Sequence, residues 1–184
     1  MPSLVYTTAQ TTDLQGIIEL QQKNLAIHLT PEAISTQGFV TVVHSLHDLK
    51  KMNHIEPHII CKDGTKVVAY LLSMTVQSQN DIPVLKPMFE MFRQVMFNGK
   101  TIAEYNYMVV GQVCVDKAYR GAGILDKCYD LYRDTFKSRF DFAITEIATR
   151  NTRSIKAHER IGFIPVHQYT DPAGEEWSIV VWNW

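Results

Sequence analysis

The chain has 184 residues, a length that suits one domain with a sizeable core and is short for two. Its formal net charge of −1 gives no overall attraction to nucleic acid or to an anionic membrane surface. Its three cysteines have no CxxC spacing, so we expect neither a disulfide framework nor a thiolate metal site. We therefore expect a single domain over residues 1–184 in the reducing cytoplasm.

Neither targeting nor metal binding is indicated by the sequence. The N-terminus lacks the basic region and long apolar run of a signal peptide. No apolar stretch is long enough to span a bilayer, so we expect no membrane partner. Histidines gather between His44 and His58, but no carboxylate or thiolate pattern completes a ligand set, and we expect no metal.

The first half of the chain predicts a strand, two helices and an antiparallel pair of strands. Asp-Gly at positions 63–64 supplies the positive φ that a hairpin turn needs. Residues 32–43 carry no clear pattern. The predicted elements are a strand at 4–7, helices at 13–27 and 45–52, and strands at 58–61 and 66–77.

Methionine and phenylalanine recur at helical spacing between Asp81 and Asn98. The pattern predicts a helix from Pro83 to Phe97, which Asn98-Gly99 would end. Two roles stay open for this helix. It can pack on the core or at a dimer interface, or it can line an adaptable apolar acceptor pocket.

The second half alternates strands and helices. Apolar residues at three- and four-residue spacing mark the helix from Ile124 to Phe140. The predicted elements are strands at 107–115, 142–149, 163–169 and 177–182, and helices at 124–140 and 152–161. The order predicts an α/β (α+β) domain with a mixed, mostly antiparallel central sheet and helices on both faces.

A glycine-rich turn follows the strand that ends at Val115. Arg120-Gly121-Ala122-Gly123 leads directly into a helix that begins at Ile124. Backbone amides at a helix N-terminus are unpaired and lie at the positive end of the helix dipole. Glycines let a phosphate approach them, and an arginine adds charge. This turn predicts a pyrophosphate site, although an ordinary tight strand–helix turn would have the same local sequence.

A second group of polar residues follows the strand that ends near Thr149. Asn151 caps the next helix, and Asn151, Ser154 and His158 lie on one face of it because three and four residues separate them. Gly162-Phe163 then begins another strand.

Together the two segments resemble the GNAT superfamily of acetyl-CoA-dependent N-acetyltransferases. Arg120, Gly121, Ala122 and Gly123 match its R-x-x-G-x-G/A motif for the CoA pyrophosphate, except that Leu125 stands where the last small residue is usual. Asn151, Ser154 and Gly162-Phe163 match the later segment, where His158 replaces a tyrosine general acid. The resemblance covers about Val113 to Phe163. It implies that Ile124, Asn151 and Ser154 also border bound acetyl-CoA.

The resemblance also implies how the chemistry is divided. Amides of Val113 and Val115 on a splayed strand would stabilise the oxyanion of the thioester. His158 is the expected proton donor for the leaving thiol. Glu146, a carboxylate in an otherwise apolar strand, is the expected general base. Glu104 is the alternative base, an ordered chain of water molecules without a single base is a further alternative, and Tyr105 or Tyr107 could line the acceptor pocket.

The expected function is therefore transfer of an acetyl group from acetyl-CoA to a primary amine of a small molecule or peptide, by direct attack in a ternary complex. An alternative is a non-catalytic acyl-CoA-binding module that regulates a partner. Acetylation of charged tRNA would call for a basic surface, which the composition does not indicate. A homodimer is an option for the oligomeric state.

Overall fold

The protein is built on a seven-stranded sheet with the order β1-β2-β3-β6-β7-β9-β8. The structure, a computed structural model, describes residues 3–184, apart from the side chain of Ser35. The parallel pair among these strands is β6–β7, and the other neighbours are antiparallel. The strands are β1 (Leu4–Thr8), β2 (Ile59–Asp63), β3 (Lys66–Met74), β6 (Tyr107–Val115), β7 (Phe142–Ala148), β8 (Ile164–Thr170) and β9 (Glu176–Trp182).

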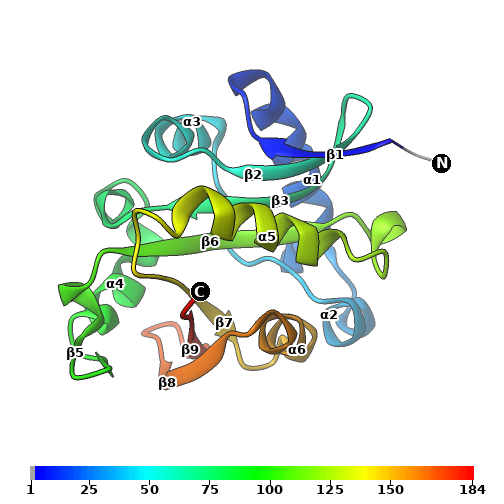
Figure 1. The fold of residues 1–184 in the computed structure, drawn as a ribbon. Helices are drawn as coiled ribbons and strands as arrows, with labels where there is room; N and C mark the ends of the chain where they lie inside the picture. Colours follow the sequence, from blue (N-terminus) through cyan, green and yellow to red (C-terminus); the bar gives the residue numbers. More distant parts are fainter. Residues whose placement is uncertain (1–2) are drawn as a thin grey trace.

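Helices cover both faces of the sheet, as the sequence predicts. In Figure 1, α5 crosses one face and α1 lies on the other. Buried Leu14, Ile17 and Leu49 fill the core on the α1 side, and Tyr129 and Tyr132 fill it on the α5 side. The helices are α1 (Leu14–Asn24), α2 (Pro31–Gln37), α3 (Leu46–Ile55), α4 (Lys86–Phe92), α5 (Ile124–Phe136) and α6 (Thr152–Ile161). The predicted mixed, mostly antiparallel α/β fold is confirmed.

Strands β6 and β7 separate along their length, and this positions the site. They pair only from Tyr107 to Val109 and from Phe142 to Ile144. Where they part, the hydroxyl of Thr145 donates to the carbonyl of Val110 at 2.8 Å. Since neither strand then has the other as a neighbour, the backbone edges of the two strands face an open gap.

A β-bulge at Gly111 changes which backbone groups face that gap. Gln112 pairs with Leu72 and Val110 with the adjacent Ser73, so Gly111 is an extra residue in β6. Such a bulge reverses the alternation of the groups that follow it. The Asp116 amide donates to the Val68 carbonyl of β3 at 2.8 Å. Backbone groups of successive residues point to opposite edges of a strand, so the amides of Val115 and Val113 face away from β3.

The region expected to be one helix from Pro83 to Phe97 is different, and that prediction was wrong. Only α4 is α-helical, preceded by a 3-10 turn over Pro83–Leu85. Strands β4 (Met96–Phe97) and β5 (Lys100–Thr101) follow it as a small hairpin. Asn98 and Gly99 form its turn with φ of 45° and 90°. Asn-Gly is a strong signal for such hairpin turns, and here it marks a hairpin rather than a helix end.

The helix expected at 13–27 ends earlier, because the chain must extend to meet a later segment. Helix α1 stops at Asn24, and Leu25 has an extended conformation with φ of −63° and ψ of 133°. Leu25 then forms a parallel bridge with Val40. Within residues 3–184, no helix combines the length and apolar character that crossing a membrane requires.

Candidate active site

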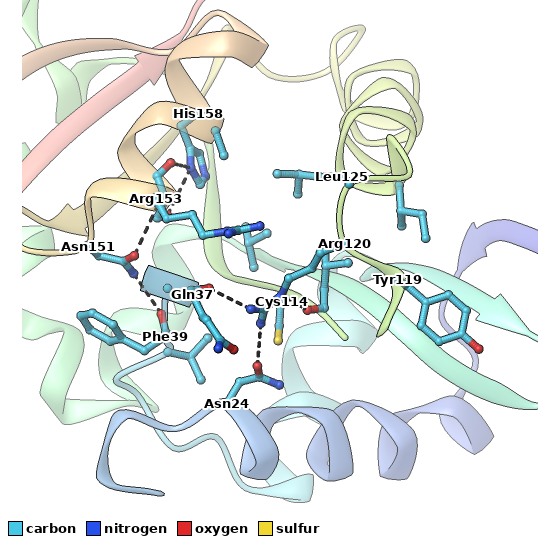
Figure 2. A pocket seen from close by; sticks show the side chains of 18 of the residues that line it. Asn24, Gln37, Phe39, Cys114, Tyr119, Arg120, Leu125, Asn151, Arg153 and His158 are labelled. Carbon is cyan, nitrogen blue, oxygen red and sulfur yellow. Dashed lines mark hydrogen bonds between the residues drawn. The ribbon is translucent and has the colours of Figure 1, made fainter. Parts of the chain in front are cut away.

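A cleft of about 420 Å³ opens beside the gap between β6 and β7. Its walls come from the end of β6, the turn before α5, the first turns of α6 and the segment after α2, as Figure 2 shows. Among the residues predicted to border the cofactor, those lining it are Val113, Val115, Arg120, Gly121, Gly123, Ile124, Asn151 and Ser154. Ala122 is exposed and does not line the cleft. The structure thus brings the two separate sequence motifs together.

The turn before α5 offers backbone donors. Gly121 and Gly123 have φ of 82° and 70°, a left-handed conformation that glycine adopts without a Cβ penalty. A Cβ built on either residue would meet no atom within 4 Å, so the turn is open on the side where a ligand would approach. Gly123 is the N-cap of α5, and the first amides of this helix lack intrahelical partners.

This turn fits a pyrophosphate. Amides at the N-terminus of a 13-residue helix favour an anion through both hydrogen bonding and the helix dipole. Asp126 in the first turn would oppose that, but Arg160 of α6 holds both its carboxylate oxygens, at 2.6 and 2.7 Å. Leu125, which stands where a small residue is usual, lines the cleft.

Arg120 lies in the cleft, but its guanidinium is held by the protein itself. Its Nε donates to the Val115 carbonyl at 2.9 Å, Nη1 to the Gln37 carbonyl at 2.9 Å and Nη2 to Asn24 Oδ1 at 2.8 Å. None of these acceptors is a carboxylate, so the positive charge is not neutralised. Arg120 therefore ties the α1–α2 region to β6 and contributes charge to the cleft from a fixed position.

Residues 36–42, called the strap below, lie along the cleft. Side chains from later elements donate to four of its carbonyls: Arg153 to Thr36 at 3.4 Å, Arg120 to Gln37 at 2.9 Å, Asn151 to Phe39 at 3.0 Å and Gln112 to Val42 at 2.8 Å. Figure 2 shows the hydrogen bonds from Arg120 to Gln37 and from Asn151 to Phe39. Asn151 also accepts from the Ser154 amide at 3.4 Å as the N-cap of α6. Its amide side chain therefore positions the strap.

His158 is enclosed, and its geometry does not fit the expected role of proton donor. It is 4% exposed, and burial lowers the pKa of its imidazole to about 4. Its Nδ1 lies 2.8 Å from the Ser154 carbonyl, which can only accept. Its Nε2 therefore accepts from the Tyr129 hydroxyl at 2.7 Å. The ring is neutral at pH 7 and both nitrogens are engaged, so we assign it a positioning role.

Glu146 lies where the sequence argument requires a base. It is mostly buried, and burial raises the pKa of its carboxyl to about 7, against the opposing effect of a hydrogen bond from Tyr169. The Tyr169 hydroxyl donates to Glu146 Oε2 at 2.6 Å. A carboxyl group with a pKa near 7 exchanges protons readily at neutral pH, which suits a general base.

A second, smaller cavity of about 90 Å³ adjoins the cleft on the Glu146 side. Val113, Asn151, Ser154 and His158 line both cavities, so the two share a wall. Residues of β7 beyond its pairing with β6, among them Thr145 and Glu146, line the second cavity. We call the second cavity the acceptor cavity.

The alternative base and the two tyrosines lie elsewhere. Glu104 is exposed and accepts from the Thr101 amide and hydroxyl at 2.7 and 2.8 Å, as a capping residue. Tyr105 and Tyr107 border a different cavity with Arg139, at the opposite end of β6. Neither tyrosine lines the cofactor cleft or the cavity that contains Glu146.

Sequence reasoning missed the strap and several cleft residues. Asn24, Gly38, Arg153 and Arg160 line the cleft without belonging to either motif. In this segment without periodicity, the glycine at position 38 was the one clue in the sequence to an unusual backbone conformation, and its φ is 71°. A Cβ on it would approach Asn151 Oδ1 to 3.2 Å, so this glycine lets the strap lie against α6.

Fold and site together define a mixed α/β protein in which the N-terminus of α5 and two separating strands border one cleft. The acetyltransferase (GNAT) family model matches residues 26–163, and the chain belongs to that family, whose co-substrate is acetyl-CoA. No curated protein matches the sequence.

Solved structures share the fold. A mosquito arylalkylamine N-acetyltransferase like 5b is 15% identical with a TM-score of 0.68, covering 97% of this chain and 99% of its own. The ribosomal-protein-S18-alanine N-acetyltransferase from Escherichia coli is 15% identical with a TM-score of 0.63, covering 97% and 92%. The yncA protein from Salmonella typhimurium, solved with acetyl-CoA, is 12% identical with a TM-score of 0.63, covering 98% and 94%. The likeness at these identities concerns the fold.

Proposed function

We propose that this acetyltransferase transfers the acetyl group of acetyl-CoA to a primary amine of a small molecule or peptide, by direct attack in a ternary complex. The observation that carries the proposal is the position of Glu146. It is a mostly buried carboxyl group with a pKa raised to about 7, in a cavity that shares a wall with the cofactor cleft. Structures named for peptide and for arylalkylamine acetylation share this fold, so the fold leaves the acceptor open.

Direct attack is favoured because the cleft offers no activated nucleophile. Cys114 is the cysteine that lines it, and this side chain is 5% exposed. Burial raises the pKa of the Cys114 thiol to about 12, so the thiolate is rare at neutral pH. An acetyl-cysteine intermediate at this position is therefore disfavoured.

The proton steps follow from the groups present. The acceptor arrives as an ammonium ion and gives a proton to the Glu146 carboxylate. The amine nitrogen then bonds to the thioester carbon, while one amide of the splayed strand, that of Val113 or that of Val115, stabilises the oxyanion. The carbon–sulfur bond breaks, and the thiolate takes a proton from water in the open cleft, because His158 has no free N–H. The nitrogen gives its second proton to the hydroxide ion left by that water, which leaves a neutral amide, and Glu146 returns its proton to solvent.

The test is amine-dependent release of free thiol from acetyl-CoA by wild type, Glu146→Gln and Glu159→Gln. Glu159 is exposed on α6 and is a matched carboxylate outside both cavities. We expect release by wild type and Glu159→Gln and a large loss in Glu146→Gln. Intersecting initial-rate patterns would support a ternary complex. Binding of acetyl-CoA without release for any amine would instead favour a regulatory binding module.

A further inference from the structure

The acceptor cavity has an apolar wall made by four distant segments. Met74 comes from β3, Leu85 and Met88 from the segment around α4, Phe39 and Val42 from the strap, and Trp177 from β9. Leu85 and Met88 are 5% and 3% exposed, so they also belong to the core. Both roles left open by the sequence for this segment are therefore compatible with its position.

Most polar groups around this cavity are already engaged. The Thr145 hydroxyl donates to the Val110 carbonyl at 2.8 Å, and Gln112 accepts from Tyr70 at 2.6 Å and donates to Val42 at 2.8 Å. Asn151 is bonded to the strap, and Trp177 Nε1 donates to Asp171 at 2.9 Å. These groups have little capacity left to recognise a substrate.

Charge in the cavity is limited to one group at neutral pH. Among the described residues that line it, Glu146 is the one carboxyl group, there is no lysine or arginine, and His158 is neutral. Glu146 Oε2 accepts from Tyr169, which leaves the rest of the carboxylate to meet an ammonium ion. A second charge of the substrate held within this lining would meet no group of opposite charge there, which disfavours such a substrate.

The size of the cavity limits the apolar part. At about 90 Å³ it is smaller than the roughly 150 Å³ apolar cavity that takes up benzene. A short alkyl chain fits this space, whereas a ring would require the flexible side chains of Met74 and Met88 to change rotamer.

We propose that the acceptor is an apolar primary monoamine, with one ammonium group on a short alkyl chain and no second charge. The Glu146 carboxylate binds the ammonium group, and the side chains of Met74, Leu85 and Met88 pack against the alkyl chain. This inference rests on the proposed function and narrows its acceptor. It excludes amino acids, diamines and peptide N-termini as good acceptors, since each carries a further charged or polar group into the apolar wall.

Three acceptors with the same four-carbon chain, which differ only in the group at the far end, test whether a second charge is excluded. Thiol release would be compared for butylamine, 1,4-diaminobutane and 4-aminobutanoate, with an uncharged-side-chain tetrapeptide as the peptide probe. We expect kcat/KM for butylamine to exceed each of the others by at least about tenfold. Equal or better turnover of the diamine, the amino acid or the peptide would overturn the inference and leave the proposed function intact. Absence of release with every amine, despite acetyl-CoA binding, would overturn both.

Variants at Met88 test the wall. Met88→Glu adds a second carboxylate to the lining of the acceptor cavity, and we expect the ratio of kcat/KM for 1,4-diaminobutane over butylamine to rise at least about tenfold. If the buried charge prevents folding of Met88→Glu, Met88→Ala is the second variant. Because it enlarges the cavity, the ratio of kcat/KM for hexylamine over butylamine should be higher than in wild type. Met91→Ala, on the same helix but outside the cavity, is the matched control. Unchanged acceptor ratios in folded Met88→Ala would contradict the assignment.

Discussion

The cofactor cleft and the acceptor cavity share a wall made by the strap, the start of α6 and Val113 of β6, but different parts of the chain build the rest of each. The cleft presents backbone donors from the turn at Gly121–Gly123 and from β6, so its function depends on local conformation. The acceptor cavity depends on side chains from distant segments, with one carboxyl group among apolar neighbours. Short motifs therefore reveal the first, whereas the second exists only after folding.

The largest effect is expected on the acceptor side. Glu146→Gln removes the proposed base and keeps the size of the side chain, so kcat should fall by about 10²-fold or more. The measurement is steady-state thiol release at saturating acetyl-CoA. Glu159→Gln should retain wild-type kcat. A Glu146→Gln enzyme with kcat close to wild type would show that water, and not Glu146, accepts the proton of the acceptor ammonium, and would contradict the role of Glu146 as the single base.

Substitutions in the glycine turn of the cofactor cleft should weaken CoA binding more than they change kcat. Gly123→Ala places a Cβ on a residue with φ of 70°, which strains the turn and crowds the approach of a phosphate. We expect the Kd for CoA to rise about tenfold, with kcat at saturation within about threefold. Calorimetric titration with CoA measures it.

A matched control exists for the glycine test. Gly174 has φ of 87° and equally open surroundings, but it lies in the β8–β9 turn. Gly174→Ala should cost similar strain and leave CoA affinity unchanged. Equal losses of affinity in both variants would mean that the effect is general destabilisation and not loss of the cradle.

The wall shared by the two cavities should affect stability more than chemistry. Tyr129→Phe leaves His158 Nε2 buried without a donor, so the free energy of unfolding should fall by about 1–3 kcal/mol. Because His158 has a positioning role here, kcat should stay within about threefold of wild type. Urea unfolding and thiol release measure the two effects. A drop in kcat of tenfold or more at unchanged fold would restore His158 to the proton-transfer path.

The smallest effect is expected where the strands part. Thr145→Val removes the hydroxyl that donates to the Val110 carbonyl at 2.8 Å. We expect a loss of about 1 kcal/mol in the free energy of unfolding and a smaller change in CoA affinity. A loss of activity far larger than this would show that the hydrogen bond controls the width of the gap.

The sequence predicted the strands and helices from Tyr107 to Ile161 well, because their apolar periodicity and their motifs are local. It did not predict the strap, since residues 32–43 have no periodicity. The side chains that hold it come from positions 70 to 117 residues away in the sequence. Asn98-Gly99 was misassigned because the same dipeptide can end a helix or turn a hairpin. The state of His158 depended on Tyr129, a partner 29 residues away that no spacing rule selects.

The most direct test is the pH dependence of kcat/KM for wild type and Glu146→Gln, with an amine acceptor that does not itself titrate between pH 5 and pH 9. The pKa of the Glu146 carboxyl in the free protein is about 7, and the base acts only when ionised. Wild-type kcat/KM should therefore rise about tenfold per pH unit below pH 7 and level off above it. Glu146→Gln should lack this inflection. The same inflection in both enzymes would show that another group supplies the base and would contradict the account.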